Sequence, residues 1–421
     1  MIKHYRFGIA RVLVNSINGE IRYFMKDIDE EKTYEVFLYQ DPTFNNVIFP
    51  QVYDNDSYSK ITLSLNFSTK CNLNCKYCFL DHKEGETLYS LEKIKEEIEN
   101  FVKRNIKKKK IFVDLSGSGE PLINLVEVMA IAKWCKKLER KYKVNVIVQF
   151  VTNGTLLDEK TVKLLQDNAV LFGVSLDGTK ENHDKNRVFS DGRPSYDLIE
   201  KNMKAIEEKQ FLGSAMVIDG SFNTNLLNCY LNMSKLSTTT SIKFKRSDHI
   251  DEYKDRADYI IGEYFNLMLY LIQMIRENDY QLLFSILRGD DTFGTMLSRV
   301  IIENKVFARC DGGVGRISLG KNYKIYPCAP SIVNSSFEGE EGINYFKSIA
   351  KIDYCNDCEC KFYCGGECPL VKEKLKSNDI YLCKIKKKLF EYSLYFKAYL
   401  LKYKKEALNT ISSFIYNKEA N

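Results

Sequence analysis

Three cysteines in one short loop, Cys71, Cys75 and Cys78, are the residues of this chain best suited to chemistry. Cysteine thiolates are the usual ligands of a [4Fe-4S] cluster, which normally takes four of them. Because the loop carries three and no fourth cysteine follows nearby in the sequence, one iron would keep an open position for a small molecule. Zinc is the alternative, but structural zinc sites normally have four protein ligands. The spacing therefore favours an iron-sulfur cluster with an open iron.

The composition narrows the class of protein. The 421 residues are too many for one ordinary domain, and a hydrophobic content of 44% is enough for at least two cores. Thirteen cysteines, with no signal peptide and no apolar run of transmembrane length, indicate metal binding in a reducing cytoplasm. The net charge of +6 is modest, so neither nucleic acid nor a membrane is expected as a partner. With four His residues and no Walker-type loop, kinase and hydrolase functions lack their usual residues.

Apolar runs of strand length alternate with segments of helical period in the middle of the chain, which predicts strand-helix units around a parallel sheet. The strands are expected at 61–66, 111–116, 145–151, 170–176, 213–219 and 241–246, and helices at 91–102, 125–138 and 196–208. Six units predict an α/β fold, a partial (β/α)6 TIM-like barrel that is open on one side. Functional residues of parallel barrels lie at the C-terminal ends of the strands, and Cys71 follows the first strand.

Three further loops follow the next strands. Residues 116–121 (SGSGEP) contain glycines, which let a ligand approach the backbone, beside a carboxylate. A plain turn before a helix that starts at Pro121 is the other interpretation. Residues 152–155 (TNGT) and 175–178 (SLDG) follow the third and fourth strands. Each is also compatible with an ordinary turn, because Asn-Gly and Asp-Gly are common turn formers.

Taken together, the cysteine loop and the three loops after it resemble the radical S-adenosylmethionine (SAM) enzymes, in the branch that modifies peptides and proteins. The resemblance implies that SAM binds the open iron of the first cluster. Ser118 stands where the family has the first Gly of its Gly-Gly-Glu-Pro run. The implied SAM-binding residues are Gly119 and Glu120 at the methionine amino end, Tyr77 near the adenine, Ser175 at the ribose and Arg187 at the carboxylate.

A second group of cysteines lies toward the C-terminus. This group has seven cysteines, and a single zinc ribbon would use only four of them. The spacing of these cysteines, with Gly365 and Gly366 among them, resembles the SPASM domain of radical SAM enzymes that act on peptides and proteins. The resemblance implies one auxiliary [4Fe-4S] cluster held by Cys355, Cys358, Cys364 and Cys383, and a second, with an open position, held by Cys310, Cys328 and Cys368. Three [4Fe-4S] clusters are therefore expected in all.

Three cysteines remain outside these sets. Cys135 and Cys229 are expected in the core, because free cysteines are among the most buried residues. Cys360 lies inside the cysteine-rich segment and could substitute for a ligand, but the resemblance assigns it no cluster.

Two positions depart from the family. Tyr323 stands where many members have a Gly, at the turn before Cys328. Ala329 stands where anaerobic sulfatase-maturing enzymes have an Asp, the base that takes the proton of the substrate. Formylglycine formation is therefore not expected, whereas an open auxiliary cluster could bind a substrate cysteine as the thiolate.

The expected domains are an N-terminal β-rich extension at 1–58, the partial barrel at 59–290, the SPASM domain at 291–385 and a C-terminal helix at 386–421. In the extension, strands at 9–14 and 21–25 would flank a turn at Asn18 and Gly19. This part either binds a leader peptide, added as a strand to the sheet edge, or packs against the barrel. Residues 254–287 have the period of a long helix.

The resemblance implies a radical SAM maturase of a ribosomally made, Cys-rich precursor peptide. An electron from a flavodoxin or ferredoxin would lead to cleavage of SAM, and the 5'-deoxyadenosyl radical would abstract hydrogen from the peptide. A thioether crosslink is the expected product. The alternatives are a carbon-carbon crosslink, Cys or Ser oxidation as in anaerobic sulfatase maturation, and, from another class, a non-catalytic iron-sulfur or zinc protein.

Overall fold

The structure of the chain is a computed structural model. It describes residues 2–8, 10–25, 59–78, 85, 89–117, 119–207, 212–245, 251–306, 310–320, 323–333, 335–340, 343, 355, 358–366, 368, 370 and 380–420. Most of the expected N-terminal extension, at 26–58, and Ser118 lie outside the described residues.

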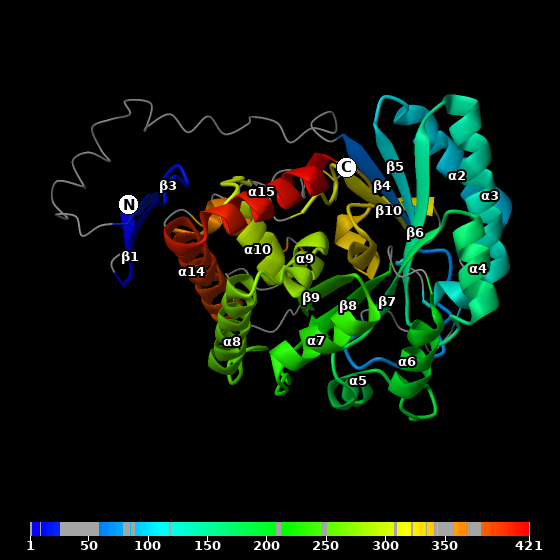
Figure 1. The fold of residues 1–421 in the computed structure, drawn as a ribbon. Coiled ribbons are helices and arrows are strands. Elements are labelled where there is room, and N and C mark those ends of the chain that lie inside the picture. Colours follow the sequence, from blue (N-terminus) through cyan, green and yellow to red (C-terminus); the bar gives the residue numbers. More distant parts are fainter. Residues whose placement is uncertain are drawn as a thin grey trace.

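An eight-stranded sheet in the order β11-β10-β4-β5-β6-β7-β8-β9 lies at the centre of the molecule (Figure 1). The six strands predicted from the sequence run parallel to one another in it: β4 (Lys60–Leu65), β5 (Lys110–Asp114), β6 (Asn145–Thr152), β7 (Leu171–Ser175), β8 (Gly213–Ile218) and β9 (Thr239–Phe244). These strands are buried on both faces, because helices cover the outer face and side chains inside the barrel cover the inner face. Their sequences are therefore rich in apolar residues, which is why they could be recognised in the sequence. The predicted α/β partial barrel is confirmed.

Two strands that the sequence did not predict extend this sheet. β10 (Arg316–Gly320) pairs in parallel with β4, and β11 (Lys324–Tyr326) pairs antiparallel with β10. The turn between them contains Tyr323 with φ at +61°, a left-handed conformation that favours glycine. The Tyr323 ring packs against Tyr89 with ring centroids 4.8 Å apart. The pairing of β10 with β4 joins the cysteine-rich part of the chain to the first strand of the barrel.

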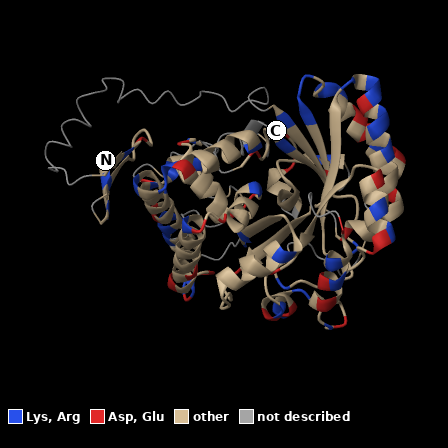
Figure 2. Ribbon diagram, in the orientation of Figure 1, with Lys and Arg blue, Asp and Glu red and all other residues tan. Residues whose placement is uncertain are grey.

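Helices cover the outside of the barrel strands. They are α2 (Leu91–Arg104), η3 (Pro121–Asn124), α3 (Leu125–Tyr142), α4 (Glu159–Asp167), α5 (Lys180–Asn186), α6 (Tyr196–Ala205) and α7 (Leu226–Leu236). Ser90 and Asp158 begin α2 and α4 by accepting hydrogen bonds from Lys93 N and Thr161 N. Figure 2 shows residues of both charge signs along α2 and α3, as is usual for solvated helix faces.

Residues 254–287 form two helices rather than one. α8 (Ala257–Arg276) ends where Asn278 takes the left-handed conformation, with φ at +60°, and Asp279 N donates to Met274 O at 2.8 Å. A residue in the left-handed conformation commonly ends a helix, because it turns the chain away from the helix axis while the last helical carbonyl groups keep their hydrogen bonds. α9 (Gln281–Arg288) and α10 (Thr292–Ile301) follow.

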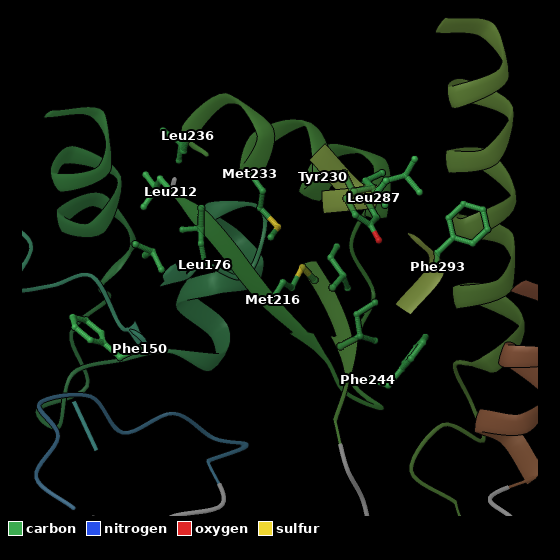
Figure 3. Close-up of a cluster of buried hydrophobic side chains, with 14 of the residues drawn as sticks. Phe150, Leu176, Leu212, Met216, Tyr230, Met233, Leu236, Phe244, Leu287 and Phe293 are labelled. Atoms are coloured by element: carbon green, nitrogen blue, oxygen red, sulfur yellow. The ribbon is translucent and has the colours of Figure 1, made fainter. Parts of the chain in front are cut away.

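The core between β8, β9 and the helices α7, α9 and α10 is apolar, with Met216, Met233 and Phe293 in it (Figure 3). A charged residue also lies there: Asp291, which is buried at the start of α10 and accepts hydrogen bonds from the Tyr230 hydroxyl, Ile242 N and Gly294 N. Burial raises the pKa of Asp291 to about 6, against the effect of these hydrogen bonds. Elsewhere in the barrel core lie Cys135 and Cys229, at 1% and 0% exposure, which confirms their expected packing role.

The N-terminal strands form a separate antiparallel sheet of β1 (Ile2–Phe7), β2 (Ala10–Asn15) and β3 (Ile21–Phe24). The Asn18-Gly19 turn is present, with Gly19 at φ +72° and Glu20 N bonded to Asn18 Oδ1 at 2.9 Å. β1 was not predicted. The sheet lies beside α14 (Ile380–Tyr403), away from α2 and α3 (Figure 1). Its buried face packs on α14 and on the cysteine-rich segment.

The C-terminal region is also two helices, because the chain turns at Lys404 into α15 (Lys405–Ala420). α14 begins at Ile380, before the predicted start at 386, so Cys383 lies on this helix. Shorter elements before it are η5 (Ala329–Val333), η6 (Ser335–Phe337) and α12 (Lys361–Cys364). Within the described part of the chain, none of the helices combines the length and the apolar character that crossing a membrane requires.

Candidate functional site

The cysteine loop lies at the C-terminal end of β4, where the loop after β5 is bonded to it. Gly119 N donates to Ser68 O at 2.8 Å, and Glu120 N donates to Lys70 O at 2.7 Å. A Cβ on Gly119 would lie 2.1 Å from Lys70 O, so only glycine permits this approach. The two loops that the sequence predicted as neighbours are therefore in direct backbone contact.

Glu120 ties these loops to the next one. Its carboxylate is buried and accepts hydrogen bonds from Thr152 Oγ1 at 2.6 Å, Asn153 N at 2.6 Å and Leu122 N at 3.0 Å. Burial raises the pKa of Glu120, whereas the hydrogen bonds act in the opposite direction. Both carboxylate oxygens are thus occupied by the protein, and Glu120 fixes the positions of the loops after β5 and β6.

Asn153 connects the loop after β6 to the cysteine loop. Its Nδ2 donates to Asn72 Oδ1 at 2.7 Å and lies 4.0 Å from Cys71 Sγ. Asn72 Nδ2 in turn donates to Thr155 Oγ1 at 2.8 Å. The sequence pointed to the motif at 152–155 but gave Asn153 no role. Its place directly after a barrel strand was the available signal.

Arg187 lies on the other side of the cysteine loop, in a buried cluster with Tyr77 and Asp177. Its Nε donates to Asp177 Oδ2 at 3.0 Å, and its guanidinium lies over the Tyr77 ring, 5.2 Å from the ring centroid. The Tyr77 hydroxyl donates to the same oxygen of Asp177. Nη1 of Arg187 lies 4.0 Å from Cys75 Sγ. The structure therefore brings Tyr77 and Arg187 to the cysteine loop and adds Asp177, which sequence reasoning had treated only as a turn residue.

His183 supports this cluster from behind. Its Nδ1 accepts from Asp177 N at 3.2 Å, and its Nε2 lies 3.0 Å from Ser195 Oγ. Because Ser195 donates its own proton to Arg187 O at 2.8 Å, the imidazole must donate from Nε2, which makes it the neutral tautomer. Burial, assisted by the charge of Arg187, lowers the pKa of His183 to about 3. The ring therefore stays neutral while it holds the backbone of both residues of the ion pair.

Ser175 is the last residue of β7 and lies two positions before Asp177, at the same end of the sheet. All the predicted SAM-binding residues thus follow strands β4, β5 and β7 at one rim, as the barrel topology requires.

The three thiols of the first loop supply the donors that an iron-sulfur cluster needs. Burial raises the pKa of the Cys71 thiol to about 11 and also raises that of Cys75, on which the nearby Arg187 acts in the opposite direction. Metal binding requires thiolates, so ligation must offset the cost of deprotonation. Among the described residues, no three His, Cys, Asp or Glu side chains converge on a position for a single metal ion.

A buried polar side chain at this rim has no partner among the described residues. Asn66 follows β4 and is 1% exposed, and neither polar atom of its amide is hydrogen-bonded to a described residue. A Cβ on Gly117 would lie 1.7 Å from Asn66 Oδ1 and 2.9 Å from the Cβ of Ala329. An unsatisfied buried amide is costly and calls for a ligand. The rim therefore fits a polar molecule bound beside the cysteine loop, and Ala329 lies at its edge.

The C-terminal cysteines fall into two groups. Cys355, Cys358, Cys364 and Cys383 line one cavity, together with Cys360. Cys310 and Cys368 line a second cavity of about 180 Å³ together with the start of α10, and Cys364 lines both cavities. Cys328 lies at the start of η5 beside Tyr326 and Ile332, and is not among the described lining residues of either cavity.

Comparisons with known proteins agree with this geometry. The model of the radical SAM superfamily matches residues 65–225, which contain the Cys71 loop and Arg187. A cysteine-type anaerobic sulfatase-maturating enzyme of Clostridium perfringens is 23% identical over 357 residues, covering 77% of this chain and 94% of the relative. The radical SAM cyclopropyl synthase TigE of Paramaledivibacter caminithermalis is 25% identical over 356 residues, covering 76% of this chain and 70% of TigE.

A solved structure shares the fold. Native anSMEcpe with bound AdoMet and Kp18Cys peptide superposes with a TM-score of 0.62 at 18% identity, covering 83% of this chain and 99% of that chain. This likeness concerns the fold. The match of the superfamily model at 65–225 and the aligned relatives make the protein a radical SAM enzyme, with SAM and a [4Fe-4S] cluster as its cofactors.

Proposed function

We propose that this enzyme modifies a peptide or protein by radical chemistry, and that the reaction is an oxidation like that of the sulfatase-maturating relatives. The observation that carries the proposal is the alignment with the Clostridium perfringens enzyme over 94% of its length, which extends beyond the barrel into the cysteine-rich part. A second relative, a serine-type anaerobic sulfatase-maturating enzyme of Bacteroides thetaiotaomicron, is 26% identical over 163 residues. These relatives favour oxidation over the thioether crosslink expected from the sequence.

Thioether formation remains the second candidate because of Ala329. The Cβ of Ala329 lies against Gly117 at the rim, where its methyl group can accept no proton. An oxidation that needs a carboxylate base at this position would be slow, whereas sulfur-to-carbon bond formation would use a substrate thiolate instead.

In the proposed mechanism the rim positions SAM at the Cys71, Cys75 and Cys78 cluster. When bound and reduced, these cofactors supply a 5'-deoxyadenosyl radical that takes a hydrogen atom from the substrate. Arg187 uses its Nε for Asp177, which leaves the guanidinium edge that faces Cys75 to bind the SAM carboxylate. Ser175 is assigned to the ribose, Tyr77 to the adenine side and the backbone at Gly119 to the methionine amino end.

We further propose that the C-terminal cysteines hold two auxiliary clusters. The cavity shared by Cys355, Cys358, Cys364 and Cys383 supports a fully ligated one. Cys310 and Cys368 share the neighbouring cavity and would be joined by Cys328, leaving one position open. These clusters would accept an electron from the substrate radical after hydrogen abstraction, and a flavodoxin or ferredoxin would be the external donor that reduces the first cluster. In the N-terminal part, the edge strand β1 is where a leader peptide would add.

The radical reaction is tested with anaerobically reconstituted protein, SAM and a strong reductant. The wild-type chain should release 5'-deoxyadenosine, and the triple variant with Cys71, Cys75 and Cys78 changed to Ala should release none. Product formation by the triple variant at the wild-type rate would refute the assignment of the first cluster.

The product is identified by mass spectrometry after incubation with a Cys-containing sulfatase peptide or co-expression with a Cys-rich peptide. Oxidation to formylglycine removes the sulfur of the substrate, whereas each thioether crosslink retains it and removes two hydrogens. The Ala329→Asp variant is assayed beside the wild-type chain as the matched comparison, because it places a carboxylate beside Gly117. If oxidation is the native reaction, the wild-type chain itself must yield the sulfur-free product.

A further inference from the structure

Cys360 belongs to a group of five cysteines, one more than a [4Fe-4S] cluster uses. It lines the same cavity as Cys355, Cys358, Cys364 and Cys383. We propose that Cys360 is a reserve ligand of this auxiliary cluster and that it binds iron in place of Cys358 when the Cys358 thiolate is lost. The inference rests on the auxiliary cluster proposed above.

The local backbone places Cys360 between two of the proposed ligands. Its Sγ lies 3.5 Å from Cys358 Sγ. Cys360 also precedes the single turn of α12, and Cys364 N donates to Cys360 O at 2.8 Å. Residues four apart in such a turn lie on the same face, so Cys360 and Cys364 are directed to the same side. A small movement of one side chain is therefore enough to exchange Cys358 for Cys360.

A purely structural role for Cys360 is the competing explanation. Cys360 is 2% exposed and contacts the apolar cluster that contains Val12 and Phe362. In that role an alanine of similar size would serve nearly as well, as for a small hydrophobic residue. A purely structural role does not explain why the Cys360 thiol lies next to the Cys358 thiol, or why Cys360 lines the cavity of the cysteines.

The charge around the cavity suits a cluster with thiolate ligands. Lys386 and Lys387, on the first turns of α14, line the cavity with the cysteines. Positive charge beside thiols favours their deprotonated form. In the exchange the iron-sulfur bond to Cys358 breaks and one to Cys360 forms, the thiol proton of Cys360 passes to the released Cys358 thiolate 3.5 Å away, and no electron is transferred.

The test measures iron and sulfide in the full chain rather than activity. A parent in which Cys71, Cys75 and Cys78 are changed to Ala removes the first cluster and leaves the auxiliary iron. In this parent, Cys358→Ala and Cys360→Ala should each keep the parental iron content and the absorption of the cluster. The double variant Cys358→Ala/Cys360→Ala should lose about four irons per chain. Cys355→Ala, in the same cavity, is the matched control and should lose about four as well.

Circular dichroism of each variant shows whether it is folded. If Cys358→Ala alone loses as much iron as Cys355→Ala while both remain folded, Cys360 is not a reserve ligand. If the double variant keeps its iron, the inference is equally wrong. If the parent itself binds no iron in this segment, or binds zinc, the auxiliary-cluster proposal fails and this inference falls with it.

Discussion

Two asparagines at the rim differ in how their side chains are bonded. Asn153 is held by its Nδ2 bond to Asn72 and by bonds from Thr155 to its Oδ1. Asn66 is buried to a similar degree, yet neither polar atom of its amide has a partner in the part of the chain that the structure describes. A buried polar group without a partner lowers stability until a ligand satisfies it. Asn153 is therefore part of the scaffold, whereas we expect Asn66 to contact SAM or substrate.

Replacing each asparagine by Ala separates these roles. Asn153→Ala should lower the free energy of unfolding of the ligand-free chain by about 1–3 kcal/mol, because it leaves bonded partners unsatisfied. Asn66→Ala should cause no such loss but should slow release of 5'-deoxyadenosine in the presence of substrate. Urea unfolding and product assays measure the two effects. Equal destabilisation by both variants, with activity retained in Asn66→Ala, would contradict the assignment.

The buried His183 makes stability depend on pH. Its pKa of about 3 in the folded chain lies below the value of about 6.5 in the unfolded chain. The unfolded state therefore binds more protons between these values, and stability is lost as the pH falls below about 6.5. Each pH unit in this window should cost about 1.4 kcal/mol.

The measurement is urea unfolding at several pH values for the wild-type chain and for His183→Gln. The wild-type chain should lose stability more steeply than the variant as the pH falls from 6.5 toward 4. Identical pH slopes would show that His183 is not held neutral.

At the scale of elements, the rim consists of loops that contact one another through backbone hydrogen bonds and through a few buried polar side chains. The loop after β5 lies against the cysteine loop because Gly119 has no Cβ. Glu120 then joins that loop to the one after β6. The β strands fix where each loop begins, and backbone hydrogen bonds between the loops fix their relative positions.

Gly119→Ala should therefore disturb the cysteine loop. The added Cβ would meet a backbone oxygen at 2.1 Å, so the two loops must separate. We expect SAM affinity, measured by equilibrium dialysis, to fall at least about tenfold, which corresponds to about 1.4 kcal/mol. Gly262→Ala in α8 is the control, because no atom lies within 4 Å of its added Cβ and Ala favours a helix. Unchanged SAM affinity in Gly119→Ala would show that the contact is unimportant.

At the scale of the whole molecule, the N-terminal sheet and the cysteine-rich segment share one apolar cluster. Val12 and Val14 of β2 pack there with Phe362 and with Phe390 of α14. The Tyr363 hydroxyl also donates to Gly19 O at 2.8 Å, and a Cβ on Gly19 would overlap Phe362. The first strands of the chain thus support the auxiliary cysteines, more than 300 residues later in the sequence.

Val12→Ala should weaken this support. Val12 is fully buried, and loss of its methyl groups should cost about 2 kcal/mol through lost contacts and a cavity. The expected result is faster release of auxiliary iron to a chelator, measured by absorbance, with the cluster at Cys71 to Cys78 retained. Lys3→Ala, on the exposed side of β1, should behave as the wild-type chain. Equal rates of iron release in both variants would argue against the coupling.

The sequence by itself located six parallel strands and the loops at their C-terminal ends, and its resemblance to a known family indicated the radical SAM chemistry of those loops. Apolar period, glycine position and cysteine spacing are local properties, so they are readable without a structure. It could not show that β10 pairs with β4, that Asp177 binds Arg187, or that Asn66 lies buried without a partner among the described residues.

Only the tertiary structure decided these features, because each depends on how segments far apart in the chain pack together. The same holds for Cys360, whose contact with Cys358 follows from the fold of the cysteine-rich loop. Ala329 was recognisable as a departure in the sequence, but its place beside Gly117 came from the pairing of β10 with the barrel.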